Sequence, residues 1–477
     1  MKKTFVIICL STINLFYSQD KTISFNVKKG EELLQYKISK QGQPFIVMGK
    51  EGKDLTIISY DSLLNLNYEK SFKSNYKGLP GFFGRGMYSS PIYYDLRVSI
   101  DGKYAVSEND KKIFYPDGRI IDTKIESFFY PKDIDHNSSF ISNENLCIIG
   151  KEMIEVKKGK YEKSDNSIFL FRNLNDLNVK KTEFKTPKIE SNQEVLKWGL
   201  SSYHKNFFFM VNKELNKERT NDKYNIVKYD YNGEILSLKS VEIKLDKKYF
   251  TASFNGFGAY AISYTGIASR HEMSSTATGN IYTDLKNNDF YIYGLYTNDK
   301  DNDFYQSTFG GFYIHKFNSE GELIWKMEKP IVDTKDFNKN SLCFHMQVDF
   351  YNLNNGQIGF AISKSNNSNF AHLFSLNEKD GKIIKSKKIE FKVNDLMREG
   401  IKNGSFPTGF NSETLIGKNN GNIETLFSTF FNPNIESFFK KNKTTKLNYK
   451  TNITENGVFL IEEDNKNNKF RILKFNN

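Results

Sequence analysis

The sequence predicts an all-β protein, a β-propeller of four-stranded antiparallel blades, and three observations support this prediction. A strand–turn–strand pattern recurs along the chain at nearly even intervals. Each copy follows another short apolar run bounded by Gly, Asn or Asp. No stretch of about 10–15 residues combines helical periodicity with helix caps, which argues against parallel βαβ units.

The recurring hairpin consists of an apolar run, a polar turn with Asp or Asn, and a second apolar run followed by Lys. The residue that ends its first run is Tyr60, Phe114, Phe171, Tyr229, Phe317 or Leu376. The intervals between these positions are 54, 57, 58, 88 and 59 residues, so the 88-residue interval indicates one insertion. Small sheets that repeat at a fixed period are the signature of a propeller, in which each blade buries its faces against its neighbours.

A second strand precedes each hairpin, and further strand candidates precede some of these, so each unit holds about four strands. These second strands are short apolar runs, as expected for strands buried on both faces. They lie at 42–49, 101–108, 143–150, 204–211, 287–294 and 355–362.

The chain termini are predicted to close the ring together. Residues 456–477 read as the second and third strands of a unit that lacks a fourth, and residues 21–28 form an extra strand before the first unit. Pairing the two gives six complete blades and one composite blade, so seven blades are favoured, with 404–450 as an insertion. If residues 423–439 form a hairpin of their own, the count is eight.

One hairpin carries a family resemblance. "GGFYIHKFNSEGELIWKMEKP" (310–330) is similar to the repeat of bacterial seven-bladed propellers, and it also resembles a quinoprotein-type blade repeat. The other copies lack the Trp, because the chain contains only Trp198 and Trp325. The resemblance implies a blade; it implies neither catalysis nor a quinone site.

The N-terminus "MKKTFVIICLSTINLFYSQD" has the form of a secretory signal peptide, with two lysines, a short apolar run and a small residue near its end. We expect cleavage near Ser18 or Gln19, which leaves residues 20–477 as a single propeller domain in the periplasm or outside the cell. The alternative, a membrane anchor, is disfavoured because spanning a bilayer takes about 20 apolar residues.

The formal net charge is +12, and the lysines are scattered, with the densest groups at 157–163 and 440–446. An anionic partner such as an acidic polysaccharide is one interpretation, and a solvated lysine-rich surface is the other. We expect a protein or glycan partner, a monomer and no transmembrane segment. Nucleic acid is disfavoured because no reader motif is present.

Two cysteines remain after signal removal, Cys147 and Cys343, and both lie in apolar runs. Two cysteines this far apart form no disulfide framework. Buried free thiols are the simpler expectation, and a single bridge would require the two strands to be close in space.

Three loops are candidate ligand sites, because propellers generally act through loops on one face. The first is the blade-5 insertion, 251–286, which is rich in Gly, Ala, Ser and Thr. It is either a ligand-contacting cap or an elongated inner hairpin. Its candidate contacts are two aromatic rings and a charged group: Tyr260, Tyr264, Arg270, His271 and Glu272.

The other two loops are weaker candidates. Arg85 lies between glycines in "LPGFFGRGMYSSP" (79–91) and could hold a carboxylate or phosphate, or the segment could be a plain connection. Asp299, Asp301 and Asp303 alternate as in calcium loops, but an EF-hand needs Gly and Glu where Phe304 and Gly310 stand. An exposed acidic turn is the alternative there.

Motifs of common enzymes are missing: the sequence has no GxSxG, HExxH, CxxC or P-loop. We therefore expect an exported, non-catalytic propeller without a cofactor, acting as a binding or interaction module. Two alternatives stay open. One is a carbohydrate-active hydrolase or lyase that uses two carboxylates at the channel mouth, and the other is a purely structural envelope component.

Overall fold

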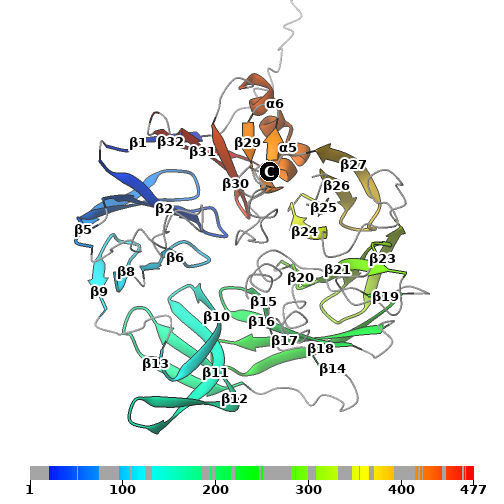
Figure 1. Cartoon of the computed structure of the whole chain (residues 1–477), viewed down its shortest axis with the longest axis horizontal. Coiled ribbons are helices and arrows are strands. Elements are labelled where there is room, and N and C mark those ends of the chain that lie inside the picture. The colour runs from blue at the N-terminus through cyan, green and yellow to red at the C-terminus, as the bar shows by residue number, and fades with distance from the viewer. Residues whose placement is uncertain are drawn as a thin grey trace, which may run out of the picture.

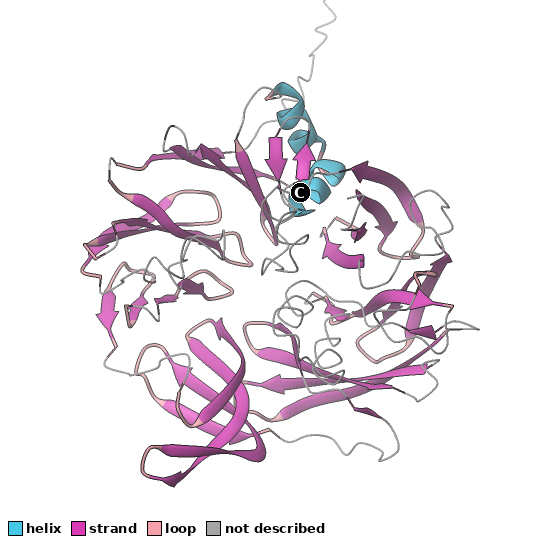
Figure 2. Ribbon diagram, in the orientation of Figure 1, coloured by secondary structure: helices cyan, strands magenta, loops and turns pink. Residues whose placement is uncertain are grey.

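The computed structural model is a ring of blades around one axis, with the strands of each blade stacked from the axis outward (Figure 1). It describes residues 21–74, 96–123, 131–184, 194–215, 221–250, 281–298, 308–330, 346–364, 370–390 and 414–476, apart from short gaps within these ranges. In these residues the strands form seven sheets, and the two helices lie together at one place on the ring (Figure 2). The seven-bladed propeller is thus confirmed.

The first three blades are regular four-stranded antiparallel sheets. Blade 1 contains β2 (Glu32–Ile38), β3 (Pro44–Gly49), β4 (Leu55–Tyr60) and β5 (Leu66–Phe72). Blade 2 contains β6 (Leu96–Val98), β7 (Ala105–Ser107), β8 (Lys112–Phe114) and β9 (Ile120–Asp122). Blade 3 contains β10 (Ile134–Ser142), β11 (Asn145–Lys157), β12 (Lys160–Asn173) and β13 (Val179–Glu183).

Blades 4 and 5 each have a divided innermost strand. In blade 4, β14 (Glu194–Val195) and β15 (Gly199–Tyr203) both pair with β16 (Phe207–Leu215), which is followed by β17 (Asn221–Asp230) and β18 (Ile235–Lys244). In blade 5, β19 (Tyr249–Phe250) and β20 (Ile281–Thr283) both pair with β21 (Phe290–Thr297), which is followed by β22 (Gly311–Phe317) and β23 (Leu323–Pro330). The predicted insertion therefore interrupts the strand nearest the axis, and its last residues belong to β20.

Blade 6 is regular, and blade 7 joins the two ends of the chain. Blade 6 contains β24 (Met346–Asn352), β25 (Gln357–Lys364), β26 (Phe370–Asn377) and β27 (Ile383–Glu390). Blade 7 contains β30 (Asn448–Thr454), β31 (Gly457–Asp464), β32 (Lys469–Phe475) and, as its outermost strand, β1 (Lys21–Asn26). Strand β1 pairs antiparallel with β32, with Phe25 opposite Phe470. The predicted closure by a composite blade is confirmed.

The insertion before blade 7 contains helices, which the sequence reading did not predict. A short hairpin of β28 (Thr414–Ile416) and β29 (Asn419–Gly421) precedes α5 (Ile423–Phe431) and α6 (Pro433–Lys441). The eight-blade alternative is therefore wrong, because 423–439 is helical. Asn432 and Pro433 separate the helices, since the Asn432 side chain caps α6 and proline is well suited to the first turn.

A side-chain acceptor in the turn explains why the outer hairpin recurs. In blade 4, the Asp230 carboxylate accepts hydrogen bonds from the backbone N–H of Asn232 at 2.8 Å and of Glu234 at 2.9 Å. Asn318 has the same role in blade 5. Such local hydrogen bonds favour turns over continued strands. Similar acceptors in the outer turns of blades 1, 2, 3 and 6 are Asp61, Asp117, Asn173 and Asn377.

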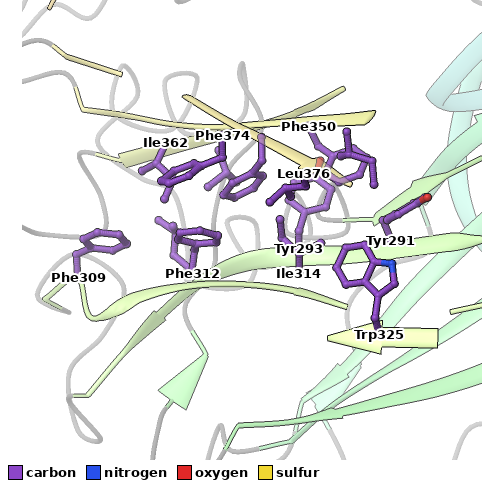
Figure 3. Close-up of a cluster of buried hydrophobic side chains, with 14 residues drawn as sticks. Tyr291, Tyr293, Phe309, Phe312, Ile314, Trp325, Phe350, Ile362, Phe374 and Leu376 are labelled. Atoms are coloured by element: carbon purple, nitrogen blue, oxygen red, sulfur yellow. The ribbon is translucent and has the colours of Figure 1, made fainter. Parts of the chain in front are cut away.

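Apolar clusters fill the space between neighbouring blades, and Figure 3 shows the one between blades 5 and 6. There the rings of Tyr293 and Phe350 stack with their centroids 5.0 Å apart. Trp325 lies at one end, where its indole N–H donates to the carbonyl oxygen of Glu378 at 3.0 Å. A Cβ on Gly381 would lie 2.6 Å from this indole, so only glycine fits there. Trp325, in the hairpin that resembles known propeller repeats, thus joins blades 5 and 6.

Cys147 lies in β11 and is a fully buried free thiol. Burial raises its pKa well above the ordinary value, so the thiol stays protonated. Cys343 lies outside the described residues.

Candidate functional site

The nine site residues predicted from the sequence lie outside the described residues. They are Arg85, Tyr260, Tyr264, Arg270, His271, Glu272, Asp299, Asp301 and Asp303. The strands that flank them do show where their loops leave the ring. Segment 75–95 connects β5 to β6, and 299–307 connects β21 to β22, so in antiparallel blades both leave the same face. The role of each of the nine residues remains a prediction.

The opposite face carries the turns between the first and second strands of the blades, and these inner turns are bonded to one another. The backbone N–H of Glu455 in blade 7 donates to the Lys40 carbonyl in blade 1 at 3.0 Å. Gln41 donates in turn to the Ile100 carbonyl in blade 2, and Ile100 to the Ile141 carbonyl in blade 3, both at 3.3 Å. The turns of four successive blades are thus linked through their backbones.

Side chains continue this linkage around the ring. The Ser142 hydroxyl of blade 3 donates to the His204 carbonyl of blade 4 at 2.8 Å. Between blades 5 and 6, the Asn352 amide donates to the Asp284 carboxylate at 3.2 Å. These bonds hold the inner turns in place, so a side chain on any of them has a defined position relative to the axis.

Lys40 lies at the centre of this face, where it contacts a blade on the far side of the ring. Its ammonium nitrogen is 4.0 Å from the ring centroid of Tyr203, which belongs to blade 4. Tyr203 stacks in turn on Phe140 of blade 3, with centroids 4.3 Å apart. A cation over an aromatic face is attracted by the ring quadrupole. We call Lys40, Tyr203, His204 and Glu455 the axial cluster.

Lys40 combines an exposed side chain with a strongly perturbed pKa. The surrounding protein lowers its pKa from 10.5 to about 8, because burial disfavours the charged form, and Glu455 partly opposes this shift. Solvent reaches part of the Lys40 residue, while neighbouring groups such as the Tyr203 ring limit the hydration of its ammonium. Lys40 is therefore mostly protonated at neutral pH and loses its charge in mildly alkaline solution.

His204 is the neutral member of the cluster. Burial lowers its pKa below the ordinary value, and nearby lysines, including Lys40, lower it further, while Glu455 opposes them. Its ring stacks on Phe207 with centroids 4.8 Å apart, and no described residue forms a hydrogen bond with its Nδ1. At neutral pH His204 is uncharged, so Lys40 is the cation of the cluster.

This arrangement can hold an anionic group. No described carboxylate lies within ion-pair distance, 4.0 Å, of the Lys40 ammonium, which contacts the Tyr203 ring. An ammonium group without a close counterion attracts carboxylate, sulfate or phosphate groups. Among the described residues, no cluster of three His, Cys, Asp or Glu side chains could hold a metal ion.

The axial cluster was missed from the sequence because its members lie in short polar turns. "SKQGQ" (39–43), "SYHKN" (202–206) and "TENG" (454–457) look like ordinary strand connections. The position of these turns within the repeats does point to the axis, however. Each of these turns comes directly before the second strand of its unit, and equivalent turns of a propeller all converge on the axis.

Comparisons with known proteins add little beyond the fold. No protein-family model matches the chain, and no curated protein sequence matches it significantly. Among solved structures, it resembles prolyl oligopeptidase B from Galerina marginata at 8% identity and a TM-score of 0.36, covering 77% of this chain and 46% of that one. The chain thus spans less than half of that enzyme.

Two further matches are described as propellers or WD40 domains. The WD40 domain of SCAP from fission yeast has 9% identity and a TM-score of 0.27, covering 95% of this chain and 98% of that one. The β-propeller domain of the Trilobed protease from Pyrococcus furiosus has 12% identity and a TM-score of 0.29, covering 70% and 80%. Likenesses this distant carry no argument about activity. The chain is a seven-bladed β-propeller.

Proposed function

We propose that the protein is an exported, non-catalytic binding propeller whose ligand is an anionic glycan. The observation that carries the proposal is Lys40, an exposed residue at the centre of one face whose ammonium has no described carboxylate within 4.0 Å. Tyr203, which lies beneath the ammonium and stacks on Phe140, holds the cation in a defined position. An anionic sugar would thus meet a cation that is fixed in place.

The electrostatics of the whole chain support an anionic ligand. The formal net charge of +12 draws anions toward the surface. The inner turns around Lys40 limit its hydration, and electrostatic attraction is stronger where water is partly excluded. A ligand group that pairs with Lys40 would also relieve the cost of burying this cation, so binding and protonation should reinforce each other.

The enzyme alternative receives less support from the described residues. A glycoside hydrolase needs a carboxylic acid whose pKa is raised so that it can donate a proton. The described carboxyl groups with a shifted pKa all shift downward. Asp117, for example, accepts hydrogen bonds from the backbone and side chain of Arg119 in an outer turn, which lowers its pKa. None of these groups belongs to the axial cluster.

Binding measurements on the mature protein test the proposal. A glycan array with uronate-containing, sulfated and neutral glycans should show binding to anionic glycans alone, and calorimetry with trigalacturonate should give its affinity. A charge-assisted hydrogen bond contributes about 1.5–3 kcal/mol, so Lys40→Met should weaken binding roughly 10- to 100-fold. The control Lys385→Met removes another lysine that contacts aromatic rings, 4.4 Å from that of Phe430, and should change little. Equal affinity of wild type and Lys40→Met would refute the proposal.

Export is a separate part of the proposal and has its own test. Residues 1–19 should direct the chain out of the cytoplasm and be removed near Ser18 or Gln19. Mass spectrometry of the protein recovered from the periplasm or medium of an expressing bacterium should find the shortened N-terminus. Recovery of the chain in the cytoplasm with Met1 intact would contradict export. In the described part of the chain, no helix is long and apolar enough to cross a bilayer.

A further inference from the structure

A second site lies beside the axial cluster, where the two helices meet the propeller. A cavity of about 240 Å³ is bordered by three parts of the chain: the inner turns of blades 6 and 7, the corner between α5 and α6, and Asn476 after β32. Its apolar wall consists of Leu353, Phe431, Ile453 and Val458. Nothing in the axial cluster lines it.

The corner between the helices is a fixed wall of this cavity. The Asn432 side-chain oxygen accepts hydrogen bonds from the backbone N–H of Asn434 at 3.0 Å and of Ile435 at 3.4 Å, which caps α6. Its amide nitrogen donates to the carbonyl oxygen of Asn476 at 2.7 Å. Asn432 is buried, so one side chain ties the helix start to the end of the chain. The cavity is therefore largely pre-formed.

The lining of the cavity favours an uncharged ligand. None of the described lining residues is charged, although 26% of the residues in the chain are. An ion placed there would lose hydration without gaining a counterion, which is costly. The polar part of the wall consists of asparagine and serine side chains, which offer hydrogen bonds to neutral groups.

Two oxygens on this wall have unused hydrogen-bonding capacity. The Ser428 hydroxyl and the Asn434 side-chain oxygen are buried and have no hydrogen-bond partner among the described residues. A buried polar group without a partner costs about 1–3 kcal/mol. Both residues border the cavity, so a rotation about their side-chain bonds would let a ligand hydroxyl pair with them.

The size and mixed polarity of the cavity define the ligand class. Small-molecule pockets generally measure about 300–1,000 Å³, and liquid water takes about 30 Å³ per molecule, so this cavity holds a single ring. A sugar ring carries C–H bonds on its faces and hydroxyls on its rim, which match the apolar wall and the polar corner. We propose that the cavity is a binding site for one uncharged sugar unit.

The cavity is close to the axial cluster, yet the inference does not rest on the proposed function. Ile453 and Val458 flank the turn that carries Glu455, whose backbone N–H bonds to Lys40. Two residues of extended chain span at most about 7 Å, so both sites lie on the same face. A neutral sugar and an anionic group can therefore be bound separately, and each site can be tested without the other.

Saturation-transfer NMR on the mature protein tests the inference with four probes. They are the neutral methyl glycosides of glucose, galactose and mannose, and sodium glucuronate, each at millimolar concentration. At least one neutral glycoside should bind, and glucuronate should not bind at the cavity. Ser428→Ala removes one hydrogen bond worth about 0.5–1.5 kcal/mol and should weaken binding roughly 2- to 12-fold. Val458→Phe should abolish binding by filling the cavity.

The variants separate this inference from the proposed function. Lys40→Met should weaken the binding of trigalacturonate and leave the affinity for the neutral glycoside unchanged. Ser428→Ala should weaken the binding of the neutral glycoside and leave the affinity for trigalacturonate unchanged. If Val458→Phe does not fold, Ser428→Ala remains informative, because it only deletes a buried hydroxyl that has no partner. The inference is wrong if no neutral glycoside binds, if glucuronate competes for the cavity, or if Ser428→Ala leaves the affinity unchanged.

Discussion

Ring closure by β1 can be tested by removing this strand from the mature chain. Strand β1 contributes Ile23 and Phe25 to the cluster between blades 7 and 1. The Phe25 ring lies 5.9 Å from that of Phe470 in its own blade and 5.8 Å from that of Tyr60 in blade 1, both measured between centroids. Deleting residues 21–28 therefore weakens the interface between blades 7 and 1, which joins the two ends of the chain.

The expected loss can be estimated from burial. A fully buried side chain of this type contributes about 1.5–3 kcal/mol, so the half-buried Ile23 and Phe25 contribute together about 2–3 kcal/mol. Their removal also uncovers Phe470 and Ile472, now 2% and 0% exposed, which costs a similar amount. The total is about 5 kcal/mol. An unfolding entropy of about 2.1 cal/mol/K per residue converts this to a Tm lower by about 5 °C.

Differential scanning calorimetry on the mature and truncated proteins measures this difference. Phe25→Ala should lower the Tm by about 2 °C, because it removes part of the same packing. Ser24→Ala is the matched control, since Ser24 is exposed on the other side of the same strand and should leave the Tm unchanged. A truncated protein that melts within about 1 °C of the mature one would refute closure by a composite blade.

Four further predictions concern three side chains, Trp325, Lys40 and Cys147. Trp325→Phe removes the hydrogen bond to Glu378 and should cost about 1–2 kcal/mol in urea unfolding, and an unchanged midpoint would contradict a structural role. Raising the pH through about 8 should weaken binding of trigalacturonate because Lys40 loses its proton, while Lys40→Met should show no such dependence in calorimetry. The pKa of Lys40 is lower in the folded protein than its ordinary value of 10.5. As the pH rises from 8 to 10.5, the free energy of unfolding of the wild type should therefore increase relative to that of Lys40→Met. In a Cys343→Ser variant, Cys147 should react with Ellman's reagent only after denaturation, and fast labelling of the folded protein would contradict its burial.

Periodicity predicted much of the fold because a blade is a local structure. The outer hairpins could be recognised from Asp or Asn in their turns. These side chains accept hydrogen bonds from backbone N–H groups only a few residues away, as Asp230 does. Ring closure was also predictable, because an incomplete unit at one end and an extra strand at the other complement each other. Helices α5 and α6 were missed because each has only nine residues and its phenylalanines also suit strands.

The candidate sites depended on contacts that no local pattern contains. By itself the sequence determined the strands of the blades, their turns and the position of the insertion in blade 5, because hydrogen bonds and apolar periodicity within each unit fix these features. It favoured seven blades over eight, and the structure decided between them because residues 423–439 belong to helices. Only the tertiary structure placed Lys40 over Tyr203, and only it brought the corner at Asn432 against the end of the chain. These residues are far apart in sequence, and the closed ring, which packs each blade against the next, determines their separation in space.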